Sequence, residues 1–146
     1  MNRWTVAVEK HISDDDVWNL LVGAFEGGSN YWINHIEVQT TWENAYKSFA
    51  HDTESTALST LRDRKKYLYN TQLPVLDPDA RISVYTCDHQ PELGAPVLTM
   101  QTIGQGLDVM ARDYPRHFDD FVTERYDADT SDVFLQCCLF NKVVYG

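Results

Sequence analysis

The sequence has little cysteine, little positive charge and no long apolar run. Its three cysteines, Cys87, Cys137 and Cys138, cannot all pair within one chain, and a bridge between the two neighbours would be strained, which excludes a disulfide framework. The longest apolar stretches, such as residues 133–135, are far too short to cross a bilayer, and the first residues lack the apolar run of a signal peptide. We therefore expect a protein of a reducing, cytoplasmic compartment.

The shortage of positive charge argues against two kinds of partner. The chain has 12 Lys and Arg against 22 Asp and Glu, a formal net charge of −10. Phosphate backbones and anionic membranes are bound through Lys and Arg, and the one basic run, residues 62–66, is short and interrupted by Asp63. We expect no direct binding to nucleic acid or membrane. An acidic surface serves solubility alone in most proteins, and its sharper interpretation is competition with nucleic acid for a basic partner.

The signals that are present predict both helices and strands. Ser13 followed by three aspartates predicts a helix start, because a capping hydroxyl and acidic residues suit the positive end of the helix dipole. Apolar residues then recur at helical spacing as far as Gly27 and Gly28, which predict the helix end. Further helices are indicated from about residue 103, from Pro115 and after the acidic cap at 127–132.

Short β-branched or alternating segments predict the strands. Residues 81–86 and 96–100 form a predicted antiparallel hairpin, residues 5–9 a predicted opening strand and residues 142–146 a short closing one. The order of elements does not alternate as in a doubly wound sheet. We therefore predict a single α+β domain, 1–146, with a small, mostly antiparallel sheet packed against several helices and a variable helical insertion at about 39–79. The strand order stays open.

Two ends of the chain resemble one protein family. Residues 12–32, ISDDDVWNLLVGAFEGGSNYW, resemble the N-terminal signature of a widespread family of small bacteriophage and prophage proteins. Other marks of that family are matched by YPRHF at 114–118, an acidic helix start at 127–129, Leu135-Gln136 and a Val-Tyr-Gly tail at 144–146. Asn141-Lys142 stand where a Gly-Glu pair is expected, and residues 39–79 are unmatched. The resemblance implies a phage origin and an accessory role inside the host, and it supplies no catalytic residue.

The segment after the first helix is a candidate ligand site. Two glycines followed by small polar residues can expose backbone N–H groups to an anion, and the neighbouring aromatic rings could stack on a base. The candidate residues are Trp18, Glu26, Gly27, Gly28, Asn30, Tyr31 and Trp32. Because a helix C-terminus repels anions, a plain helix stop with Tyr31 and Trp32 in the core is the alternative interpretation.

Metal and catalytic motifs are weak. The five histidines are scattered, and Cys87-Asp88-His89 is the only tight Cys/His group, so we predict no metal and no cofactor. A nucleophile could be assembled from Cys137 or Cys138 with His117 and Asp120, but a reactive thiolate needs positive surroundings that this chain lacks. We name no catalytic residue.

Acidic residues at helix starts supply the leading functional hypothesis. These are Asp14, Asp15, Asp16, Asp127, Asp129 and Asp132, and Asp119 and Asp120 could add to the same surface. If they share one face, they could imitate a run of phosphates and occupy the binding groove of a host defence or nucleic-acid-handling protein. The hypothesis is a non-enzymatic, anti-defence binding protein and inhibitor. The alternatives are a protein that sequesters a nucleotide signal and a small Cys/His enzyme, and a homodimer stays open.

Overall fold

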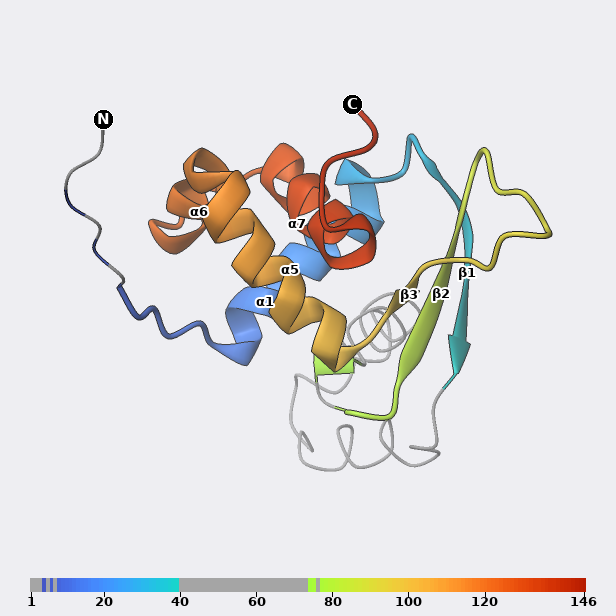
Figure 1. The fold of residues 1–146 in the computed structure, drawn as a ribbon, viewed down its shortest axis with the longest axis horizontal. Coiled ribbons are helices and arrows are strands. Elements are labelled where there is room, and N and C mark those ends of the chain that lie inside the picture. Colours follow the sequence, from blue (N-terminus) through green and yellow to red (C-terminus); the bar gives the residue numbers. More distant parts are fainter. Residues whose placement is uncertain (1–3, 5, 7, 40–73, 76) are drawn as a thin grey trace, which may run out of the picture.

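The computed structural model describes residues 4, 6, 8–39, 74–75 and 77–146 (Figure 1). Most of the predicted insertion at 39–79 lies outside this part of the chain. The described elements are α1 (Asp14–Gly23), the π-helical turn η1 (Ala24–Gly28), β1 (Ile33–Gln39), β2 (Arg81–Thr86), β3 (Val97–Leu98), α5 (Met100–Asp113), α6 (Pro115–Val122) and α7 (Ala128–Phe140). Helices and an antiparallel sheet confirm the predicted α+β class.

The helices begin where the sequence predicts, because their caps are local. The Ser13 hydroxyl accepts a hydrogen bond from the Asp16 N–H at 3.1 Å, and Asp127 accepts one from the Thr130 N–H at 3.1 Å. Thr99 begins α5 with a reciprocal capping box to Thr102. Helix α1 continues directly into η1, which ends at the predicted glycine pair.

The sheet has the strand order β1-β2-β3, and both pairings are antiparallel. The predicted hairpin is therefore confirmed as β2 and β3, with Ile82 opposite Leu98. Strand β1 was not predicted. The predicted opening strand is wrong at its described residues, 6, 8 and 9, and the closing strand at 142–146 is wrong, because neither segment has strand structure.

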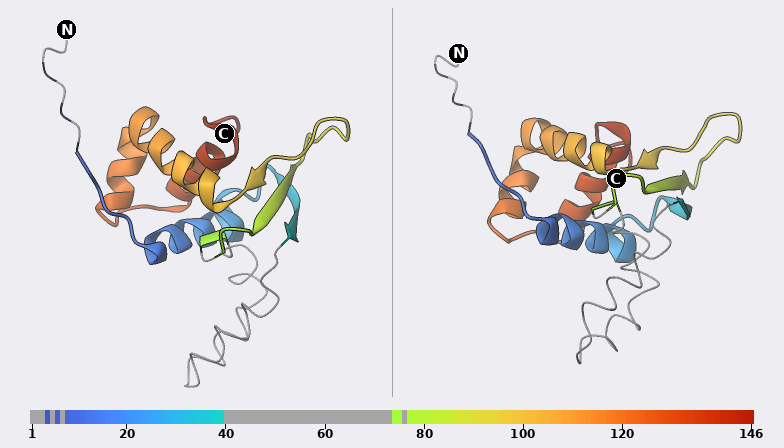
Figure 2. Two further views of the ribbon diagram at one scale, coloured as in Figure 1. Left: turned by 60° about the horizontal axis from the view of Figure 1, so that its bottom comes forward. Right: turned by 90° about the horizontal axis from the view of Figure 1, so that it is seen from below.

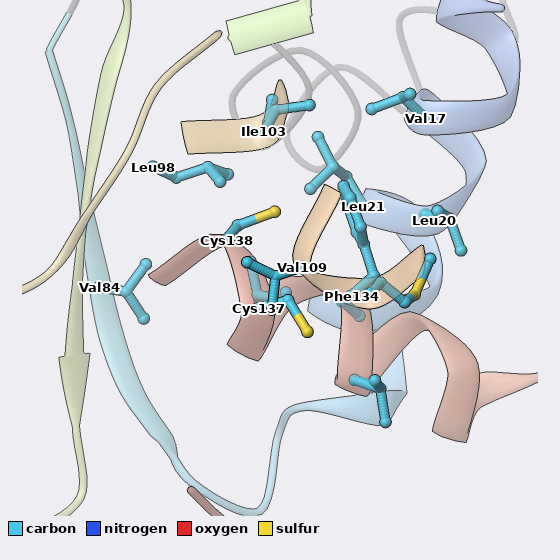
Figure 3. Close-up of a cluster of buried hydrophobic side chains, with 14 of the residues drawn as sticks. Val17, Leu20, Leu21, Val84, Leu98, Ile103, Val109, Phe134, Cys137 and Cys138 are labelled. Atoms are coloured by element: carbon cyan, nitrogen blue, oxygen red, sulfur yellow. The ribbon is translucent and has the colours of Figure 1, made fainter. Parts of the chain in front are cut away.

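Helix α7 is the centre of the core. Every residue from Thr130 to Cys138 is buried, and α5, α1 and η1 all pack against it. Figure 3 shows Leu20 and Leu21 of α1 close to Phe134 of α7, with the thiols of Cys137 and Cys138 among apolar side chains. The helices lie on one side of the molecule, and the sheet lies beside the C-terminal end of α7 (Figure 2).

Candidate functional site

Two polar side chains lie in the buried surface of α7. Asp132 is 7% exposed and Gln136 is completely buried. Residues four apart lie on the same face of a helix, so both point towards the same side of α7. That side meets the segment after η1 and the C-terminal tail, residues 143–146. A buried polar group destabilises a protein unless it is hydrogen-bonded, so the partners of these two side chains define the site.

Asp132 binds the segment that follows η1. The Ser29 hydroxyl at 2.8 Å and the Trp32 Nε1–H at 2.7 Å donate to its Oδ1, and the Tyr31 hydroxyl donates to its Oδ2 at 2.6 Å. All three donors are neutral, and no Lys or Arg in the described part of the chain pairs with this carboxylate. Three short hydrogen bonds replace those to the water that burial removes, and they stabilise the carboxylate in the interior.

Close approach of backbones brings these groups together. A Cβ on Gly28 would collide with the carbonyl oxygen of Ala128, in the first turn of α7, and a Cβ on Gly23 would collide with the Ser131 side chain. A Cβ on Gly27 would meet nothing within 4 Å. Only the second glycine of the pair is therefore required by packing, and it places Ser29 and Trp32 against Asp132.

Gln136 binds the tail. Its Oε1 accepts hydrogen bonds from the N–H groups of Val144 at 2.7 Å and Tyr145 at 2.8 Å, and its Nε2–H donates to the Tyr145 carbonyl at 3.1 Å. The chain reaches this position because Asn141 ends α7 in the left-handed conformation, with φ 60°. Glycine favours that conformation and Asn tolerates it, so Asn141 allows the turn without a glycine.

Aromatic rings close the same site. The Tyr145 ring stacks on the Trp32 ring, with centroids 5.1 Å apart and an interplanar angle of 3°, and Phe140 contacts both rings. The Tyr145 hydroxyl donates to Asp88 Oδ1 at 2.6 Å, and Thr86 donates to the same oxygen at 2.8 Å. The tail thereby connects α7 with the end of β2.

Burial and hydrogen bonds together set the protonation of these groups. Burial and the bond to Asp132 raise the pKa of Tyr31 to about 12. Burial and the bond to Asp88 also raise the pKa of Tyr145, and the hydroxyls of Tyr145 and Thr86 lower the pKa of Asp88. Both tyrosines are therefore donors at neutral pH, and Asp88 is an ionised acceptor.

The candidate ligand residues separate into two groups. Trp32 is 1% exposed and lies under Tyr145, so its ring is covered in this structure, and Gly28 is packed against α7. Trp18 is half-buried in α1. Glu26, Gly27 and Asn30 are exposed, and Tyr31 is 56% exposed although its hydroxyl is bound. Of the candidate residues, the structure brings Tyr31 and Trp32 together, because the polar groups of both side chains donate to Asp132.

The acidic residues also separate. The prediction that Asp132 belongs to an exposed acidic surface is wrong. Its side chain is buried and accepts hydrogen bonds from three donors inside the molecule. The other seven are exposed or half-buried: Asp14, Asp15, Asp16, Asp119, Asp120, Asp127 and Asp129. Hydrogen bonds from Thr130 lower the pKa of Asp127, which keeps this carboxylate ionised.

The thiols of α7 are poorly suited to nucleophilic chemistry. Burial raises the pKa of Cys137 to about 12 and the pKa of Cys138 well above its ordinary value, and both disfavour a thiolate. His117 approaches Thr130, with 3.4 Å between Nδ1 and Oγ1. Among the described residues, no three His, Cys, Asp or Glu are grouped as a metal site would require.

Comparison with protein-family models, curated proteins and solved structures finds no match to this chain. No helix in the described residues combines the length and apolar character needed to span a membrane. The residues that sequence reasoning missed are Ser29, Asp88, Gln136 and Tyr145. One signal could have found two members of the site: Asp132 and Gln136 stand four residues apart, and every other residue from 133 to 140 is apolar.

Proposed function

We propose that the chain is a phage-encoded binding protein that acts without catalysis in the host cytoplasm. Its partner is a basic host protein, one that handles nucleic acid or serves in defence, and binding inhibits that partner. The observation that carries the proposal is a set of seven carboxylates on α1, α6 and α7, which we call the acidic end: Asp14, Asp15, Asp16, Asp119, Asp120, Asp127 and Asp129.

The arrangement of the helices supports a common surface. Asp16 of α1 and Glu124, just after α6, line one hollow together with Phe121 and Val122. The views agree that the start of α1 and helix α6 lie at the end of the helical layer away from the sheet (Figures 1 and 2). Asp119 and Asp120 lie within α6, and Asp127 and Asp129 follow the connection to α7.

In the described part of the chain, carboxylates outnumber cations at this surface. The ion pairs of the described residues join Arg112 to Asp113 and His11 to Glu9, and no carboxylate of the acidic end takes part in one. Lys10 is the one lysine that lines the hollow beside Asp16. A field of one sign steers a partner of the opposite sign and gives fast, salt-sensitive association. A protein surface that normally holds phosphates has that complementary charge.

The test compares two triple variants with the same change in net charge. Asp14→Asn, Asp15→Asn and Asp16→Asn remove three of the seven charges of the acidic end, and Glu26→Gln, Glu92→Gln and Asp108→Asn remove three charges from exposed residues elsewhere. Each tagged protein is incubated with host lysate at low and high salt, and the captured proteins are identified. We expect the wild type and the second triple to capture a basic nucleic-acid-binding or defence protein at low salt, and the first triple to lose it.

Two outcomes contradict the proposal. One is that the wild type captures no basic protein at low salt. The other is that the two triples lose the partner equally, because net charge and not the acidic end would then explain the capture. Inhibition is measured on the captured protein in its own nucleic-acid-binding assay, in which the first triple serves as the inactive control.

A further inference from the structure

The segment before α1 exposes apolar side chains at alternate positions. We call residues 4–9 the arm, of which the structure describes residues 4, 6, 8 and 9. Val6 is 79% exposed and Val8 is 69% exposed, and Trp4 is exposed as well. Alternate residues of an extended chain lie on one face, so these side chains would form one apolar face of a strand. Contiguous exposed apolar surface of this kind marks an interaction site.

One edge of the sheet is open. Strand β1 pairs with β2 on one side, and no strand of the described chain pairs on its other side. The Val84 N–H donates to a carbonyl just before β3 at 2.9 Å, so the neighbours of Val84 point their backbone groups towards β1. Their partners in β1 are His35 and Glu37. The N–H and C=O groups of the alternate residues, Ile36 and Val38, therefore point away from β2 to the open edge.

This open edge suits the arm. Natural sheets protect their edges with Pro, with Lys or with very short strands, whereas β1 has seven residues and contains neither Pro nor Lys. Ile36 and Val38 pack against the core while half-buried, so the apolar face of the sheet continues to this edge. A strand added there with Val6 and Val8 on the same face would extend that apolar face. Its backbone groups would pair with the outward groups of β1.

The charge of the arm favours contact with a second copy of the chain. The whole chain has a formal net charge of −10. Residues 1–12 contain two cations, Arg3 and Lys10, and one anion, Glu9, a net charge of +1. In addition, Glu37 is exposed on β1. The acidic remainder of another copy therefore attracts the arm.

The sheet of its own chain lies far from the arm. The views agree that the arm leaves the start of α1 at the end of the helical layer away from the sheet (Figures 1 and 2). The ten residues of α1 and the turn η1 separate the arm from β1. Two copies that lie antiparallel to each other place the arm of each beside the sheet of the other.

We propose that the arm adds as a strand to the open edge of β1 in a second copy of the chain. The second copy returns its own arm in the same way, which closes a two-fold dimer. The exchange gives the apolar side chains of the arm and the outward backbone groups of β1 their partners. This proposal is independent of the acidic end.

Sedimentation equilibrium of the full chain, from micromolar to millimolar concentration, measures self-association. We expect a monomer–dimer equilibrium for the wild type. Val8→Asp places a charge on the apolar face of the arm and should weaken the dimer about tenfold. Leu93→Asp is the matched control, because it makes the same change at a 60% exposed residue of the connection between β2 and β3. The control should associate as the wild type does.

Amide hydrogen exchange followed by NMR locates the contact. The N–H groups of Ile36 and Val38 should exchange about tenfold more slowly at high than at low protein concentration, because the added strand covers them only in the dimer. The Glu37 N–H faces β2 in both states and is the internal control, whose exchange rate should not depend on concentration.

Three results overturn the proposal. The first is a wild type that stays monomeric at millimolar concentration. The second is a Val8→Asp variant that associates as tightly as the wild type. The third is a dimer in which the N–H groups of Ile36 and Val38 exchange as fast as in the monomer, because the contact between copies would then lie elsewhere.

Discussion

The two sides of α7 are equally buried but are built from different interactions. Towards α5, Gly106 lies so close to Cys138 that a Cβ would collide with its backbone and thiol, and the contact is apolar. Towards η1 and the tail, the contact consists of hydrogen bonds: Asp132 accepts from Ser29 and Trp32, and the Gln136 amide binds backbone groups of the tail. Shape determines the first contact, and complete hydrogen bonding determines the second.

The difference teaches what each side tolerates. An apolar contact weakens gradually as buried side-chain volume is removed. A buried polar network is stable when complete, and removing one member lowers the free energy of unfolding sharply because its partners stay buried without a hydrogen bond. The polar side also specifies one arrangement, because only one register of the segment after η1 places three donors on Asp132. We expect substitutions on the polar side to depend on chemistry and those on the apolar side to depend on size.

The largest effect is expected at Asp132. Asp132→Ala leaves the buried Ser29 hydroxyl and Trp32 Nε1–H without an acceptor, so the free energy of unfolding should fall by about 3–5 kcal/mol. Asp132→Asn keeps one acceptor oxygen and should cost about half as much. Urea denaturation measures both. Equal losses would mean that volume matters here and hydrogen bonding does not.

Glycine pairs compare the two sides directly. Gly106→Ala and Gly28→Ala each introduce a Cβ against α7 and should lower the free energy of unfolding by about 1–3 kcal/mol. Their neighbours Gly104 and Gly27 have nothing within 4 Å of a built Cβ, so Gly104→Ala and Gly27→Ala should be neutral or stabilise by up to about 1 kcal/mol. Controls as unstable as the test variants would refute the close approach.

Gln136 and Tyr145 should act as one unit on the polar side. Gln136→Leu removes the acceptor of two tail N–H groups and should lower the free energy of unfolding by about 2 kcal/mol. Tyr145→Ala removes the stacked ring. Because both release the same tail, the double variant should lose less than the sum of the single losses, as a double-mutant cycle of urea denaturation measures. Additive losses would show that the ring and the backbone of the tail are held separately.

The smallest effect is expected from pH. The pKa of Tyr31 is raised from 10.0 to about 12 in the folded chain, so the folded state binds this proton more tightly than the unfolded state does. Its contribution to stability is complete below pH 10 and is lost as the pH rises towards 12. Tyr31→Phe should therefore make stability fall less steeply over this range, measured by thermal unfolding. Tyr126→Phe serves as the control and should follow the wild type.

Local signals explain what the sequence predicts well. The caps at Ser13 and Asp127 and the alternation in β2 depend on residues a few positions apart, so the helix starts and the hairpin are predictable. Strand β1 escapes detection because an irregularity between Ile33 and His35 breaks its alternation. The closing strand is wrong because tail N–H groups bind side chains, a partner that alternation does not encode.

The candidate site was predictable only in part. The sequence predicts a ligand site or a helix stop that includes Glu26, Gly27, Gly28, Asn30, Tyr31 and Trp32. In the structure Tyr31 and Trp32, together with the missed Ser29, bind Asp132. That carboxylate sits near a helix start, where capping is a sufficient explanation from local sequence. Its true partners lie about a hundred residues away, and nothing in a single sequence reports a contact of that range.

The separation of 103 residues between Ser29 and Asp132 has a consequence for biosynthesis. A ribosome makes the glycine-rich turn early and its acceptor near the end, so the nascent chain carries the Trp32 indole without its acceptor for most of translation. Native assembly of this region therefore waits until α7 has emerged from the exit tunnel. Messages truncated ahead of that helix would yield polypeptides that expose the indole and are prone to aggregation or proteolysis.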